Sequence, residues 1–107
     1  MTDRELLELA AKAANIRIKW DDQNETYATC NVHGQLFDDW DPLNDDGDAF
    51  RLAVKLSLNV NIYNLVVSYE NADEYIEKHL PEGVIYDVAE ATRRAIVRAA
   101  AEIGREK

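Results

Sequence analysis

Apolar residues recur at helical spacing in three segments of the chain, residues 3–14, 47–58 and 88–103. The first segment follows Thr2 and has Glu5 three residues later, the capping-box pattern that satisfies free amides at a helix start. The third segment begins with the same pattern, and we expect it to end at Gly104, since glycine is the usual helix stop. The pattern therefore predicts three main helices.

The middle helix is apolar around nearly its whole circumference. Its only polar stripe consists of Asp48, Arg51 and Lys55. A helix of this kind is buried on more than one side. We therefore expect it to pack against a sheet and also against a second helix or another subunit, which makes it the predicted contact of a homo-oligomer.

Strand patterns fill the chain between these helices. The alternation of Ile16, Ile18 and Trp20 with basic residues is typical of a half-buried strand. Further strand-like runs are residues 27–32, 35–40, 59–69 (one long strand or two short ones) and 84–86, while 71–79 reads as a short helix or loop. We predict an α+β fold in one domain, residues 1–107: an α-β-α layered sandwich with a mainly antiparallel sheet and three main helices.

Charge is distributed very unevenly along this chain of 107 residues. It has 21 acidic and 12 basic residues, for a net charge of −9. Residues 20–50 contain nine of the acids and no lysine or arginine, so the remainder is neutral. Net acidity argues against direct binding to nucleic acid or to an anionic membrane, because both depend on cationic side chains. The 47% hydrophobic residues are nevertheless enough for a core.

The sequence contains no catalytic constellation and no metal-binding motif. The single Cys30 excludes an intrachain disulfide and a multi-cysteine metal site, and no apolar run is long enough to span a membrane. An EF-hand aligned on Gly47 would need carboxylates where Pro42 and Ala53 stand. We expect no enzyme, no metal and no cofactor, and a cytoplasmic protein.

Two clusters contain the candidate ligand-binding residues. The acidic loop before the middle helix brings together Trp40, Asn44, Asp48 and Arg51, a ring and an arginine fork suited to a base and a phosphate. Thr92 and Arg93 stand in the first turns of the last helix, where free amides favour anions. The alternatives are structural: the tryptophan anchors the loop in the core, and the charged residues cap helices or form ion pairs.

Two blocks of sequence resemble a family of small bacteriophage proteins, the phage ABA sandwich domain. The more specific block is WDPLNDDGDAFRLA at residues 40–53, and the other is EATRRAIVRAAAEIG at residues 90–104. Together they cover about a quarter of the chain. The resemblance implies a small α-β-α domain from a phage or prophage, but no catalytic residues and no activity.

Three hypotheses for function remain at this point. The first is a counter-defence protein that sequesters a nucleotide-type immune signal of the host without cleaving it. The second is an acidic inhibitor that mimics nucleic acid through residues 20–50 and binds a host defence protein, such as a nuclease or a CRISPR complex. The third is a regulatory or scaffold domain whose acidity maintains solubility.

Overall fold

The chain alternates three helices with six short strands, as the computed structural model describes them for residues 1–63, 66–69, 72–75 and 87–107. In order along the chain, the elements are α1 (Asp3–Ala13), β1 (Ile18–Asp21), β2 (Thr26–Cys30), β3 (Leu36–Trp40), α2 (Asp46–Lys55), β4 (Asn59–Asn61), β5 (Val66–Tyr69), β6 (Ala72–Tyr75) and α3 (Val88–Arg105). The predicted α+β class, the antiparallel strands and the three main helices are confirmed.

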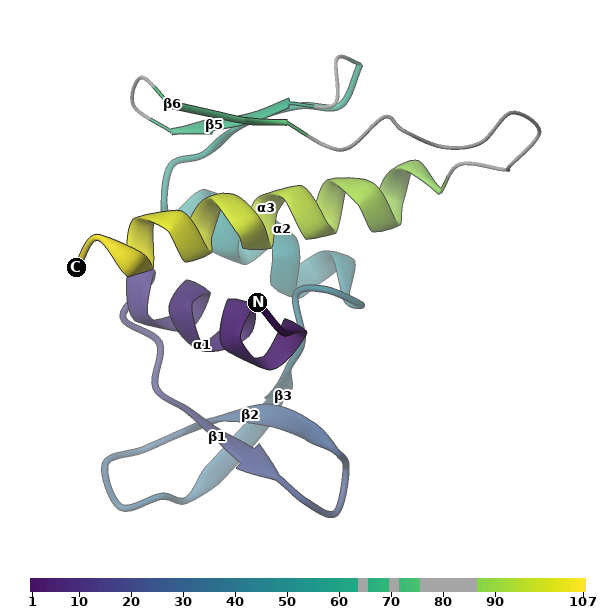
Figure 1. The fold of residues 1–107 in the computed structure, drawn as a ribbon. Coiled ribbons are helices and arrows are strands. Elements are labelled where there is room, and N and C mark those ends of the chain that lie inside the picture. Colours follow the sequence, from purple (N-terminus) through teal and green to yellow (C-terminus); the bar gives the residue numbers. More distant parts are fainter. Residues whose placement is uncertain (64–65, 70–71, 76–86) are drawn as a thin grey trace.

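The strands form two separate sheets, each with three antiparallel strands in sequence order. Figure 1 shows the helices between them, with the β1–β3 sheet next to α1 and the β5–β6 hairpin on the far side of α3. The layer order is thus sheet, helices, sheet, whereas we expected helices on the outside of one sheet. Each set of strands pairs with its neighbours in sequence, the commonest connection for short strands.

Side-chain caps fix where the helices begin. The Thr2 hydroxyl accepts a hydrogen bond from the Glu5 amide at 3.1 Å, and the Glu5 carboxylate accepts from the Thr2 amide at 3.4 Å. Asp45 caps α2 by accepting from the amide of Asp48 at 2.8 Å. The predicted capping box at Thr2 and Glu5 and the capping role of the acidic loop are therefore confirmed. At the start of α3, Asp87 caps the helix by accepting from the Glu90 amide at 3.1 Å, but the reciprocal bond of the predicted second capping box is absent among the described residues.

The predicted end of the last helix is wrong, since α3 continues through Gly104 to Arg105. Gly104 lies inside the helix and directly against α1. A β-carbon at this position would overlap the carbonyl oxygen of Leu9 and would lie 2.8 Å from the carbonyl carbon. The glycine therefore permits two helices to touch rather than ending one of them.

The strand predictions hold in part. Residues 59–69 form two short strands, β4 and β5, as one of the two alternatives had it. Residues 72–75 form strand β6, which corrects the expectation of a helix or loop there. The expected strand at residues 84–86 lies outside the described residues.

Helix α2 buries one side and exposes the other. Ala49, Leu52 and Ala53 are buried in the core, whereas Phe50 is 69% exposed and Val54 is 60% exposed. The described residues thus cover α2 on one side only. Contact with another subunit through α2 stays a prediction.

The core lies mainly where α1 meets α3. Its most deeply buried members there are alanines, with Ala10, Ala99 and Ala100 completely covered. Small side chains let the two backbones approach closely, which is why the contact tolerates no β-carbon at Gly104. The close packing of α3 against α1 fixes the position of α1, and α1 forms one wall of the site described below.

Candidate functional site

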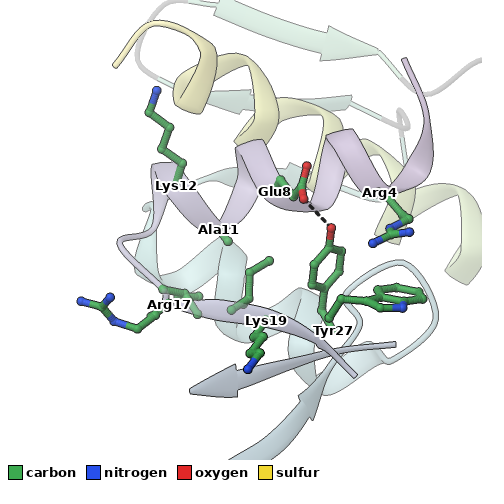
Figure 2. Close-up of a pocket in the computed structure, with 10 residues that line it drawn as sticks. Arg4, Glu8, Ala11, Lys12, Arg17, Lys19 and Tyr27 are labelled. Atoms are coloured by element: carbon green, nitrogen blue, oxygen red, sulfur yellow. Dashed lines mark hydrogen bonds between the residues drawn. The ribbon is translucent and has the colours of Figure 1, made fainter. Parts of the chain in front are cut away.

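A basic cleft lies between α1 and the first two strands of the neighbouring sheet. It has a volume of about 410 Å³. Its charged and aromatic lining residues are Arg4, Glu8, Lys12, Arg17, Lys19, Trp20 and Tyr27, with Ala11, Ile16 and Ile18 forming the apolar floor. Figure 2 shows Glu8 and Tyr27 meeting between the helix and the strands with Arg4 beside them, whereas Lys19 points away from α1.

Helical spacing explains the α1 wall of the cleft. Arg4, Glu8 and Lys12 are four residues apart, so they form one stripe along the helix. The opposite side of α1 carries Leu7 and Ala10, which are buried in the core. Because the apolar side is fixed against the core, the charged stripe is held facing the sheet.

Strand pairing supplies the aromatic wall. Trp20 of β1 lies directly opposite Tyr27 of β2, and their rings meet edge to face at 5.1 Å between centroids. The guanidinium carbon of Arg4 lies 3.9 Å from the centroid of the Trp20 ring, a cation–π contact. The tryptophan is therefore covered by a charged side chain that a flexible stem can move aside.

Tyr27 connects the sheet to α1 at the centre of the cleft. Its hydroxyl donates to the Glu8 carboxylate at 2.6 Å, the hydrogen bond drawn in Figure 2. The tyrosine is only 3% exposed. Burial raises the pKa of Tyr27 above its ordinary value, and the hydrogen bond to Glu8 raises that pKa further. The phenol therefore stays protonated at neutral pH and keeps Glu8 occupied.

Cations outnumber acids around this cleft. Four basic side chains line it (Arg4, Lys12, Arg17 and Lys19) against one carboxylate, Glu8, in a chain whose net charge is −9. Among the described residues, Lys12, Arg17 and Lys19 form no ion pair and no hydrogen bond through their side chains. In Figure 2 the side chains of Lys12 and Arg17 reach outward at the rim. The cleft thus has a surplus of positive charge that is free to meet an anion.

The residues predicted from sequence lie elsewhere, and the structure divides them. Trp40, Asp48 and Arg51 line one groove of about 830 Å³ beside α2. Thr92 and Arg93 line a different cleft of about 700 Å³ between α2 and α3. Asn44 lines neither of them. The six residues therefore do not form one pocket.

The groove beside α2 is acidic rather than suited to an anion. Five aspartates line it against two cations: Asp38, Asp39, Asp41, Asp45 and Asp48 against Arg51 and Lys55. A phosphate there would meet more negative than positive charge. Trp40 is only 5% exposed and belongs to the core cluster, so most of its ring is already covered.

Each polar residue predicted in that loop already has a partner within the chain. Asp48 accepts from the Asp41 amide at 2.9 Å and from the Arg51 guanidinium at 2.7 Å. The Asn44 side-chain amide donates to Asp41 at 2.8 Å. These contacts fit the structural alternative of capping and ion pairing. A role for these residues in ligand binding stays a prediction.

The two residues on α3 are also engaged or covered. Arg93 donates to the carbonyl oxygen of Leu43 at 2.9 Å and to Asp46 at 2.7 Å, which fastens the loop before α2 to α3. The Thr92 hydroxyl is buried and has no hydrogen-bond partner among the described residues. The cleft that they line is mostly apolar, with Phe50, Val54 and Ile96 among its walls.

The residues of the basic cleft were not predicted from sequence. In the sequence, Arg4 and Lys12 are polar positions of the first predicted helix, and Arg17 and Lys19 are the polar positions of a predicted strand. Nothing in these two patterns indicates a shared site. One signal was present: these four cations come shortly before the stretch without lysine or arginine, residues 20–50. Their convergence depends on how α1 packs over β1 and β2, which a one-dimensional pattern does not contain.

Two further findings concern the described part of the chain. It contains no group of three His, Cys, Asp or Glu side chains placed to hold a metal ion. None of its helices is long and apolar enough to cross a membrane. No protein-family model, curated protein or solved structure matches the chain. The resemblance to the phage ABA sandwich domain therefore stays a prediction.

Proposed function

We propose that this protein binds a small anionic ligand of nucleotide type in the basic cleft and holds it without chemical change. The observation that carries the proposal is the surplus of cations along the cleft, with Lys12 and Arg17 unpaired at its rim, together with the edge-to-face pair of Trp20 and Tyr27. Phosphate groups attract such cations, and the local surplus of positive charge offsets the acidity of the whole chain.

The aromatic wall supports a ligand with a planar ring. Trp20 presents its face to the guanidinium of Arg4, and planar groups of many kinds stack on an indole. A base could take the position of Arg4, which would then be released toward a phosphate. The volume of about 410 Å³ lies within the usual range for pockets that hold small molecules.

Binding rather than catalysis is supported by the state of the one carboxylate in the cleft. Glu8 accepts the short hydrogen bond from Tyr27 and is thereby held against the wall of the site. Tyr27 itself is kept protonated by its raised pKa. The phenol is therefore not poised to exchange a proton with a ligand at neutral pH.

The biological setting of the proposal comes from the resemblance to small phage proteins. A phage protein that holds a nucleotide-type signal in the host cytoplasm would lower the free concentration of that signal and so blunt the defence that it activates. This setting is a part of the proposal that the chemistry of the cleft alone does not require.

Isothermal titration tests the proposal with linear and cyclic ADP-ribose and with cyclic dinucleotides as probes. We expect heat of binding with at least one of them, and recovery of the unchanged compound after denaturation of the protein. Lys12→Gln removes one unpaired cation and should weaken binding roughly tenfold, the usual cost of one charge-assisted contact.

The matched control is Lys55→Gln, which removes an exposed lysine from the acidic groove beside α2. It changes the net charge of the chain by the same amount and should leave affinity nearly unchanged. Equal loss in both variants would show that only the overall charge matters, and absence of heat with every probe would refute the proposal.

A further inference from the structure

The β1–β2–β3 sheet has two open edges, one on β1 and one on β3. In the described residues each of these outer strands pairs only with β2. Open edges present unpaired backbone amides and carbonyls, which can pair with a strand of another chain. What distinguishes one edge from the other here is charge.

Two residues of opposite charge occupy equivalent positions on these edges. Lys19 of β1 and Asp39 of β3 both lie beside Ala28 of β2 in the register of the sheet. Trp20, Tyr27 and Trp40 form the next row, which faces the helices. Since successive side chains alternate between faces, Lys19 and Asp39 share the outer face.

Both charges are exposed and unpaired. Neither Lys19 nor Asp39 makes a side-chain hydrogen bond or an ion pair within the described part of the chain. The one acid within β1, Asp21, is held at the far end by the amide of Gln23 at 3.0 Å. The β1 edge is therefore basic near Lys19, and the β3 edge is acidic at Asp38 and Asp39.

The backbone of β3 is irregular opposite Thr29, because the register of β2 and β3 shifts between Ala28 and Cys30. The amide of Asp38 donates toward β2, to the hydroxyl of Thr29 at 3.3 Å. Phe37 is 59% exposed, so an apolar side chain is available on the same strand as the two aspartates.

We infer that β3 of one copy pairs with β1 of a second copy, so that the chain associates head to tail. Like edges repel each other, because β1 would bring lysine against lysine and β3 aspartate against aspartate. Unlike edges attract each other. The occupant of the acidic edge is therefore the basic edge of another copy of this chain.

The direction of this pairing follows from the faces. A second copy displaced sideways without rotation keeps its helices on the same side of the sheet as the first. Its β1 then runs parallel to β3, and Lys19 of the second copy lies on the same face as Asp39 of the first. Because each copy then has one free β1 edge and one free β3 edge, this head-to-tail contact continues into a filament or closes into a ring.

A charge exchange tests the inference by sedimentation velocity over a range of protein and salt concentrations. The unchanged chain should self-associate, more weakly as salt is added. Lys19→Glu and Asp39→Lys should each weaken association about tenfold, because an attractive pair becomes a repulsive one. The double variant K19E/D39K restores the pair with reversed signs, and so does an equimolar mixture of the two single variants; both should associate like the unchanged chain.

Phe50→Ser is the control for contact through α2, and it should leave association unchanged. Loss of association in this variant would place the interface on α2 and overturn the inference, as would failure of the double variant to recover. An unchanged chain that stays monomeric at every concentration would also overturn the inference. That result would instead favour a basic host protein as the partner of the acidic edge. Thermal melts of every variant verify that a loss of association is not a loss of folding. Asp39→Lys tests association independently of the ligand, since Asp39 lies outside the basic cleft, whereas Lys19 is among the residues that line it.

Discussion

Gly104 of α3 packs against the carbonyl group of Leu9 in α1, with no room for a side chain between the two helices. Gly104→Ala would usually favour a helix, by about 1 kcal/mol. Here we expect the opposite, a loss of about 1–3 kcal/mol in the free energy of unfolding, because the added methyl group must push the two backbones apart. Urea denaturation followed by circular dichroism measures this change.

Gly47 of α2 provides the matched control for that substitution. A β-carbon there would meet only the flexible ends of Arg51 and Asp45, at 3.2–3.3 Å. Gly47→Ala should change the free energy of unfolding by less than about 1 kcal/mol in either direction. Equal effects at the two glycines would contradict the close approach of α1 and α3.

The hydrogen bond from Tyr27 to Glu8 ties the sheet to α1, so its removal should lower stability. Tyr27→Phe keeps the ring and its contact with Trp20 but deletes the hydroxyl. We expect a loss of about 1 kcal/mol in the free energy of unfolding, the usual net contribution of one hydrogen bond. Urea denaturation at neutral pH is the measurement, and an unchanged midpoint would show that the bond contributes nothing.

Alkaline pH should destabilise the fold through the same tyrosine. The pKa of Tyr27 is raised in the folded chain, by burial first and by Glu8 second, so the folded chain holds the phenolic proton more tightly than the unfolded chain does. Its contribution is fully present below the unfolded pKa of about 10 and is lost as pH rises through the folded value. Denaturation curves from pH 8 to 11 should show this loss, and Tyr27→Phe should show less of it.

Thr92 offers a substitution that should stabilise the protein. Its hydroxyl is buried without a hydrogen-bond partner among the described residues, and such a group costs about 1–3 kcal/mol. Thr92→Val replaces the hydroxyl by a methyl group of similar shape and should raise the free energy of unfolding by about 1 kcal/mol. Thr92→Ser keeps the hydroxyl and serves as the control. Destabilisation by valine together with a loss of ligand affinity would instead favour the ligand role predicted for Thr92 from sequence.

Local patterns predicted the helices well because their determinants are local. The capping residues Thr2 and Asp87 and the spacing of apolar residues lie within one segment of chain, and the structure has all three helices close to the predicted ranges. Gly104 was misread because its cause is not local. Glycine often ends a helix because it allows the backbone to turn. Gly104 instead leaves room for the carbonyl group of Leu9 in α1, a helix that is far away in sequence.

The site could be predicted less well than the fold, for a related reason. Acidic residues concentrated before α2 drew attention to Arg51 and Arg93, yet the same acids are the partners of those arginines. The cations that line the cleft come from two parts of the chain, Arg4 and Lys12 from α1 and Arg17 and Lys19 from the β1 region. Only the packing of the helix over the sheet brings these residues to one cleft.

The two tryptophans allow the most direct test of the central claim, that the anion binds in the basic cleft. Trp20 lines this cleft, whereas Trp40 lines the acidic groove, so their indole N–H signals report on the two sites separately. A titration with the best-binding nucleotide, followed by ¹⁵N–¹H correlation spectra, should shift the Trp20 signal and leave that of Trp40 nearly in place. A shift of Trp40 alone would place the ligand beside Arg51 and contradict the account.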